Sequence, residues 1–222
     1  AKTAVRDAGL RVSGLCRGGM FPAATAAERR ERIEDNRRAI EEAATIGTDV
    51  LVLVCGPPPD RDIAAARAMV EEAIRELTPF AADHGVRLAV EPLHPMFAAD
   101  RSVIATLREA NNLVERIGSP QVGVIVDAYH VWWDADVYDE IARCGRNILG
   151  FHVSDWIVPL PDVLLGRGMM GDGFIELRRL RTAVDAAGYD GPIEVEIFNQ
   201  AIWDAPGDEV LALMCRRFLE HV

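Results

Sequence analysis

The feature that most constrains the fold of this chain is a regular alternation of short apolar segments with longer amphipathic ones. The apolar segments cover residues 11–16, 49–55, 86–91, 122–127, 148–153 and 193–198. The amphipathic segments cover residues 26–46, 63–83, 102–117, 136–143 and 175–187, and a glycine closes most of them, as is common at helix C-caps. Strands that alternate with helices predict a parallel sheet joined by right-handed crossover connections.

The residues at the strand ends favour a closed barrel over an open sheet. In a TIM barrel, the functional side chains come from the C-terminal ends of several strands. Four of the six predicted strands end in or next to a side chain able to bind a metal, namely Glu91, Asp127, His152 and Glu196. An open sheet more often has a glycine-rich phosphate turn after its first strand, and Gly18-Gly19 is a poor match to that turn.

The number of units falls short of a complete barrel. Six strand–helix units are predicted, whereas a TIM barrel has eight. The first ten residues also resemble the tail of a helix with a glycine cap at Gly9. We therefore expect one domain over residues 1–222, an α/β TIM (β/α)8 barrel that lacks its first two strand–helix units in this sequence.

Side-chain alternation predicts that the four polar strand ends form one ring. Residues two apart in a strand face the same side, so turning these side chains inward leaves mainly aliphatic residues to face the helices. Three carboxylates and an imidazole, without fixed cations nearby, would repel one another unless a cation joined them. We predict one divalent ion, with Mn²⁺ or Mg²⁺ favoured by the oxygen-rich ligands and Co²⁺ or Zn²⁺ as alternatives.

A further glutamate lies one layer deeper on the same face as Glu196. Glu194 would be costly to bury unless it were paired. Arg87, which the same alternation turns inward below Glu91, is the predicted partner. We therefore expect a structural role for Glu194 rather than a ligand role.

Composition narrows the classes of partner. The formal net charge of −11 argues against nucleic acid, which requires a basic face. No apolar run reaches the length of a membrane span. The four cysteines show no metal-site spacing, which predicts reduced thiols and a cytoplasmic location. Whether the chain forms a homo-oligomer is left open.

The strand ends also carry local sequence motifs. These are Leu88-Ala89-Val90-Glu91-Pro92, Val126-Asp127-Ala128-Tyr129-His130, Gly150-Phe151-His152-Val153-Ser154-Asp155 and residues 188–196, which read GYDGPIEVE. The chain resembles the sugar phosphate isomerase/epimerase family of xylose isomerase-like TIM barrels, which includes the D-tagatose 3-epimerase-like enzymes. The resemblance implies that the four polar strand ends hold the metal and that Glu91 and Glu196 move the substrate proton. It further implies that His130 and Arg167 contact the substrate.

Several residues near the strand ends have two possible roles. Trp133 and His94 are candidate substrate-binding residues, although both can equally serve in packing or lie exposed in a loop. Asp155 is predicted either to orient His152 as a hydrogen-bond acceptor or to cap a turn. The segment 157–173 is long enough to predict a mobile lid, stiffened by prolines at its start and left free by glycines in its second half.

These features predict a sugar isomerase or epimerase that acts through a metal-stabilised ene-diolate. The alternative is a metal-dependent lyase that dehydrates a sugar, an inositol-derived ketone or a related hydroxyketone. A repair endonuclease is disfavoured by the acidic charge and by only five histidines, and a silent regulatory protein by the intact pair of glutamates. With Lys2 as the only lysine, a neutral carbohydrate is favoured over a sugar phosphate.

Overall fold

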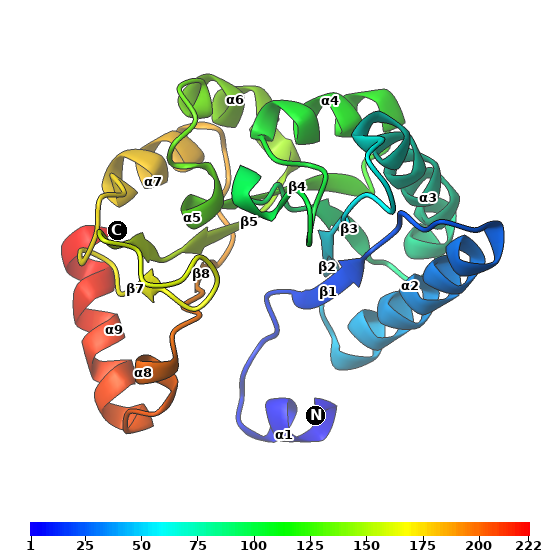
Figure 1. Ribbon diagram of the computed structural model, residues 1–222. Helices are drawn as coiled ribbons and strands as arrows, with labels where there is room; N and C mark the ends of the chain where they lie inside the picture. Colours follow the sequence, from blue (N-terminus) through cyan, green and yellow to red (C-terminus); the bar gives the residue numbers. More distant parts are fainter.

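The computed structural model describes residues 1–222 and consists of a curled parallel sheet with helices on its outer side (Figure 1). The sheet strands are β1 (Leu15–Gly19), β2 (Val50–Val54), β3 (Arg87–Val90), β4 (Val122–Asp127), β5 (Ile148–Val153) and β8 (Ile193–Val195). The helices are α1 (Lys2–Asp7), α2 (Ala26–Ile46), α3 (Ile63–Asp83), α4 (Leu107–Ile117), α5 (Ala128–Val131), α6 (Val137–Cys144), α7 (Leu177–Ala186), α8 (Gln200–Trp203) and α9 (Gly207–His221). Two 3₁₀ turns cover Pro95–Phe97 and Gly145–Asn147, and a separate two-stranded ribbon pairs β6 (Asp155–Trp156) with β7 (Arg167–Gly168).

All six strands of the sheet are parallel, in the order β1-β2-β3-β4-β5-β8. The sheet curls as a TIM barrel does, and its two edge strands, β1 and β8, do not pair with each other (Figure 1). One side-chain bond joins the segments at these edges, because the hydroxyl of Ser13 donates to the carboxylate of Glu194 at 2.9 Å. The predicted barrel fold is thus confirmed, with six strands in the curled sheet.

Local sequence signals explain the helices. The first long helix, α2, begins with a capping box between Thr25 and Glu28 and ends at Gly47, which has a φ of 95°. Helix α4 begins with the side chain of Thr106 as its cap and ends at Gly118 in the same left-handed conformation. The predicted bounds of α2 and α3 are those observed, because their capping residues mark both ends clearly.

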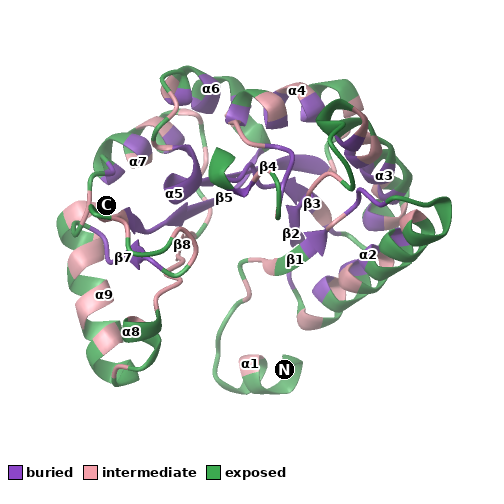
Figure 2. Cartoon of the chain, in the orientation of Figure 1, coloured by how far each residue is buried: buried purple, intermediate pink, exposed green.

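Two apolar layers build the core on either side of the sheet. The larger layer packs the outward-facing strand residues, such as Leu88, Val124 and Phe151, against the helices (Figure 2, purple). The smaller layer fills the inside of the curl with Val50, Val52, Ala89, Ile125 and Leu149. Buried apolar area of this kind is the main favourable term in folding.

One predicted side-chain direction is wrong in β5. Strict alternation counted back from the inward-facing His152 would place Ile148 inside the curl, but Ile148 belongs to the outer layer and Leu149 to the inner one. The pairing of β4 with β5 shifts by one residue, so that Ile125 lies opposite Gly150. A bulge of this type changes the face to which the preceding residues point, and alternation resumes correctly at His152.

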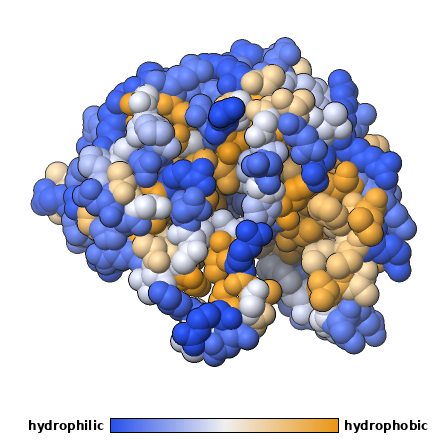
Figure 3. All heavy atoms as spheres, turned by 180° about the vertical axis from the view of Figure 1, so that it is seen from behind, coloured by the Kyte–Doolittle hydropathy of each residue, from blue (hydrophilic) through white to orange (hydrophobic).

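The C-terminal helix lies beside the opening between the edge strands. None of the residues of α9 is buried, and Leu211 and Leu219 are exposed on it. Seen from behind, apolar residues gather around a hollow in the surface (Figure 3). This helix was not among the amphipathic segments predicted from the sequence.

Two simpler expectations concern cysteines and membranes. All four cysteines are free, with Cys55 and Cys144 buried. None of the helices has both the length and the apolar character needed to cross a membrane.

Candidate metal centre

The four predicted ligands meet at the C-terminal end of the sheet. Glu91 follows β3, Asp127 ends β4, His152 lies in β5, and Glu196 follows β8, so four adjacent strands each contribute one residue. One ligand atom of each side chain lies within 4.8 Å of those of the other three. The convergence predicted from side-chain alternation is therefore present in the structure, and we refer to these residues as the ligand cluster.

Glu91, Asp127 and His152 are buried and Glu196 is partly exposed, and the charges of the four groups shift one another's pKa values. Burial opposes the charged form of His152, but the nearby carboxylates of Glu91, Asp127 and Glu196 outweigh it and raise the pKa of His152 to about 9. Burial and the charges of Asp127 and Glu91 raise the pKa of Glu196 to about 8. Shifts of this kind are typical of carboxylates forced together in a functional site.

The donor atoms fit a divalent cation. His152 Nδ1 lies 3.3 Å from Glu91 Oε1 and 3.9 Å from Glu196 Oε2. Glu91 Oε1 and His152 Nδ1 are both buried without a hydrogen-bond partner, an arrangement that normally costs free energy. A shared cation would satisfy both atoms, and three oxygen donors with one nitrogen donor suit a hard or borderline divalent ion.

Arg167 supplies a fixed positive charge that the sequence argument did not anticipate at the cluster. Its Nη1 donates to Asp127 Oδ2 at 3.1 Å and to Glu196 Oε2 at 2.9 Å. The guanidinium is buried between the rings of Tyr129 and Phe198, with centroid distances of 4.5 Å and 4.9 Å. Burial opposes the charge of Asp127, but Arg167 outweighs burial and helps to lower the pKa of that carboxyl. A cation that displaced the protons held by His152 and Glu196 would meet three carboxylate charges and only one guanidinium, so the cluster would still attract it.

His130 lies behind the ligand cluster in α5. Its Nδ1 accepts a hydrogen bond of 3.1 Å from the backbone N–H of His94, and its Nε2 lies 3.1 Å from Arg167 Nη2. Burial lowers the pKa of His130 to about 4, which keeps the ring neutral. Asp127 Oδ2 is 3.6 Å from the same Nε2, so His130 adjoins both the cluster and Arg167.

The other two predicted substrate residues lie in an aromatic group next to the cluster. The ring of His94 stacks on Trp156 with a centroid distance of 4.9 Å and meets Trp133 edge-on at 5.5 Å. Trp133 is partly exposed, and its Nε1 donates to the backbone carbonyl of His130. The structure thus brings His94, Trp133, His130 and Arg167 into one connected group, and their contact with substrate remains a prediction.

Asp155 organises the loop that carries Arg167. Its buried carboxylate accepts hydrogen bonds from the backbone N–H groups of Gly171, Gly173 and Ile175, at 2.9 to 3.0 Å. Of its two predicted roles, the structure therefore supports the turn cap. These bonds and the β6–β7 ribbon hold the second half of residues 157–173 in this structure, and its movement as a lid stays a prediction.

The predicted pairing of Glu194 with Arg87 is also wrong. Arg87 donates instead to Asp49 at 2.7 Å, and Glu194 accepts from Ser13. Asp49 directly precedes β2, the neighbouring strand, and so lies nearer to Arg87 than a residue of β8 does. A partner on a neighbouring strand needs less side-chain reach than a partner across the barrel.

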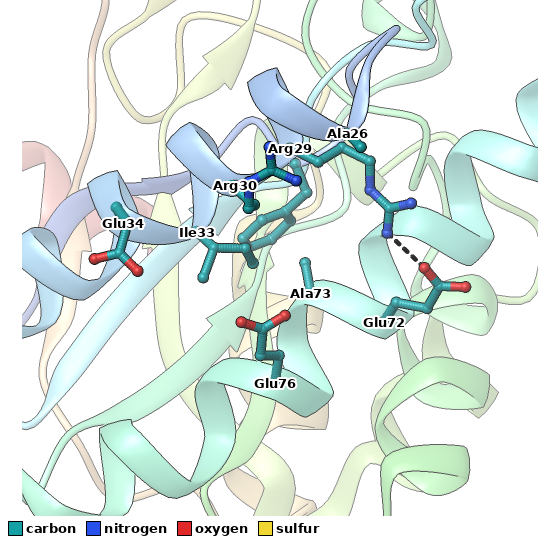
Figure 4. Close-up of a pocket in the computed structure, with 9 residues that line it drawn as sticks. Ala26, Arg29, Arg30, Ile33, Glu34, Glu72, Ala73 and Glu76 are labelled. Atoms are coloured by element: carbon teal, nitrogen blue, oxygen red, sulfur yellow. Dashed lines mark hydrogen bonds and ion pairs between the residues drawn. The ribbon is translucent and has the colours of Figure 1, made fainter.

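A separate cavity of about 440 Å³ lies on the outer surface between α2 and α3 (Figure 4). Arg29 forms an ion pair with Glu72 across it, and Ile33 and Ala73 line its floor. It contains no histidine or cysteine and shares no residue with the ligand cluster.

The family description "Xylose isomerase-like TIM barrel" matches residues 1–217. With the fold and the ligand cluster described above, this match shows that the chain belongs to the xylose isomerase-like TIM-barrel family. The crystal structure of protein SMc04130 from Sinorhizobium meliloti is similar to the chain, with 49% identity and a TM-score of 0.96. It is matched over 99% of this chain and 82% of that one.

Two curated relatives are enzymes. A 3-dehydroshikimate dehydratase of Pseudomonas aeruginosa is 32% identical over 187 residues, which cover 80% of this chain and 28% of the relative. A ketose 3-epimerase of Arthrobacter globiformis is 24% identical over 140 residues, which cover 63% of this chain and 44% of the relative. The match with each of these relatives thus spans less than half of that relative's length.

Proposed function

We propose that this chain is a divalent-metal-dependent enzyme that isomerises or epimerises a neutral sugar or a related hydroxyketone. The observation that carries the proposal is the convergence of Glu91, Asp127, His152 and Glu196 within 4.8 Å. All four residues would hold the ion. When bound, the ion would serve as a Lewis acid toward adjacent oxygens of the substrate, favouring loss of a proton from the neighbouring carbon.

The two glutamates are the proposed acid and base. Glu91 and Glu196 come from strands separated by β4 and β5, so their carboxylates approach a substrate from different sides. If one removes a proton and the other returns one on the opposite face, the product is an epimer. If a single carboxylate carries the proton to the adjacent carbon, the product is an isomer.

Substrate contacts are proposed for Arg167, His130, His94 and Trp133. Arg167 has donors beyond those used by Asp127 and Glu196, and its Nε is buried without a partner. The aromatic group around His94 would provide an apolar surface for the C–H face of a sugar, as aromatic rings do in other binding sites. These contacts would orient the substrate and exclude water from the reacting carbon.

Dehydration is a second candidate function. The specific observation in its favour is the 32% identity with a 3-dehydroshikimate dehydratase over 80% of the chain. The same proton abstraction leads to a lyase when the carbon next to the carbanion carries a hydroxyl group that can leave as water.

The proposal extends to the ion, the domain and the compartment. Mn²⁺ or Mg²⁺ is favoured by the oxygen-rich ligand cluster. Residues 1–222 are proposed to form one domain, and free cysteines such as the buried Cys55 and Cys144 support a reducing, cytoplasmic setting. No nucleic acid or membrane partner is proposed for this acidic chain.

The test is incubation of the protein and Mn²⁺ with ketoses, aldoses and inositol-derived ketones in D2O, followed by mass spectrometry. Incorporation of deuterium into a product of unchanged carbon formula is expected. A Glu196→Gln variant is the control and should abolish the exchange. Loss of water from the substrate would move the assignment to the dehydratase. Absence of any reaction, with metal bound, would overturn the proposed substrate class.

A further inference from the structure

A small cavity lies beneath the ligand cluster, inside the curl of the sheet. Its volume is about 20 Å³, enough for one water molecule. Its polar lining groups include the side chains of His152, Glu194, Ser13 and Tyr189. The Tyr189 hydroxyl already donates to the backbone carbonyl of Pro192 at 2.6 Å. Glu194 is the only carboxylate among the residues that line this cavity.

The two ring nitrogens of His152 face different surroundings. Nδ1 lies on the side of the ligand cluster, 3.3 Å from Glu91 Oε1. Nε2 lies on the side of Gly150, because a Cβ atom added to that glycine would come within 3.5 Å of it. A side chain at Gly150 would also collide with Ile125, so glycine keeps this part of the barrel interior open below the ring.

Glu194 is placed to serve the second nitrogen. It lies on β8, next to β5 in the sheet (Figure 1), and its Cα is the direct register partner of the Cα of His152. Its Oε2 is held by the hydroxyl of Ser13 at 2.9 Å, while its other oxygen accepts no hydrogen bond within the protein. A histidine that binds metal through one nitrogen normally donates its other N–H to a carboxylate, a carbonyl or a water molecule.

We propose that Glu194 is a positioning residue for the metal centre, accepting the Nε2–H of His152 through one water molecule in this cavity. This contact would fix the tautomer that presents Nδ1 to the ion and would hold the orientation of the ring. The inference rests on the proposed metal-binding function of the ligand cluster. It replaces the purely structural role that the sequence suggested for Glu194.

The first test measures Zn²⁺ affinity by competition with a chromophoric chelator. Glu194→Met, which keeps the volume but removes the acceptor, should weaken Zn²⁺ binding by about 10- to 100-fold. Glu194→Gln retains an acceptor oxygen, so its Zn²⁺ affinity should fall much less than that of Glu194→Met. Tyr189→Phe alters the same cavity without touching the acceptor and should bind Zn²⁺ as the wild type does.

The second test is ¹⁵N NMR of the histidine rings in the Zn²⁺-loaded protein, assigned with a His152→Asn variant. The expected spectrum shows Nδ1 on the metal and a protonated Nε2 whose exchange with solvent accelerates in Glu194→Met. Metal on Nε2, or equal affinity for Glu194→Met and Tyr189→Phe, would overturn the inference alone. Failure of the wild type to bind Zn²⁺, Mn²⁺ or Co²⁺ would overturn the proposed metal site and this inference with it.

Discussion

Asp155→Asn should destabilise the loop that carries Arg167. The carboxylate accepts four backbone N–H groups, those of Gly171 and Gly173 on Oδ2 and those of Trp156 and Ile175 on Oδ1. An asparagine keeps one oxygen and turns an NH2 group toward the other donors, so the N–H groups of Gly171 and Gly173 would face a donor. Each hydrogen bond to a charged acceptor contributes about 1.5–3 kcal/mol, and water can reach the exposed Gly171, so the expected loss is about 3 kcal/mol.

The assay is urea unfolding of the wild type and the variant, with amide hydrogen exchange at Gly171 and Gly173. Both amides should lose protection in the variant. Asp162→Asn is a matched control in the same loop, because Asp162 also accepts two backbone N–H groups but is exposed. Its expected loss is below about 1 kcal/mol, as for most surface substitutions. Unchanged stability and protection in Asp155→Asn would refute the anchoring role of this carboxylate.

Three further predictions concern charge, pH and packing. Arg167→Met should lower the unfolding free energy of metal-free protein by about 3 kcal/mol, because buried carboxylates lose their cation, and added Mn²⁺ should restore most of it; an unchanged urea midpoint would contradict this. Because the pKa of His152 is raised in the folded protein, protonated His152 stabilises the fold fully at pH values below its ordinary pKa of 6.5. This stability is lost as the pH rises through about 9. Metal-free protein should therefore be less stable at pH 9.5 than at pH 6.5, by on the order of 3 kcal/mol in urea titrations, and saturating Mn²⁺, which requires the neutral imidazole, should remove the decline. Gly123→Ala should cost about 1–3 kcal/mol in the same assay, because its methyl group would collide with the backbone of Asn147; Gly207→Ala, which meets no atom within 4 Å, should leave stability nearly unchanged.

The elements with strong local signals could be predicted closely from the sequence. The bounds of β4 and β5 and of α2 and α3 agree with those predicted, because apolar runs and capping residues define them. The ligand cluster followed from the same reasoning, since alternation along a strand fixes which side chains turn inward.

The parts that were mispredicted or not predicted depend on contacts between distant segments. The bulge at Leu149 requires knowledge of how β5 pairs with β4. The placement of Arg167 depends on Asp155, which lies 12 residues earlier and shapes the loop through backbone N–H groups. Glu194 was predicted as the partner of Arg87 because both were expected to face the barrel interior. Arg87 instead pairs with Asp49, which lies next to the neighbouring strand and is closer. Sequence alternation carries none of this information.

The origin of the ligand cluster in four different strands has a consequence for folding. Its members lie far apart along the chain and meet only when β3, β4, β5 and β8 are in place. The unfolded chain therefore offers no preformed site. An ion held there would favour the folded sheet by mass action, so the chain would reach its full stability only when the ion is supplied.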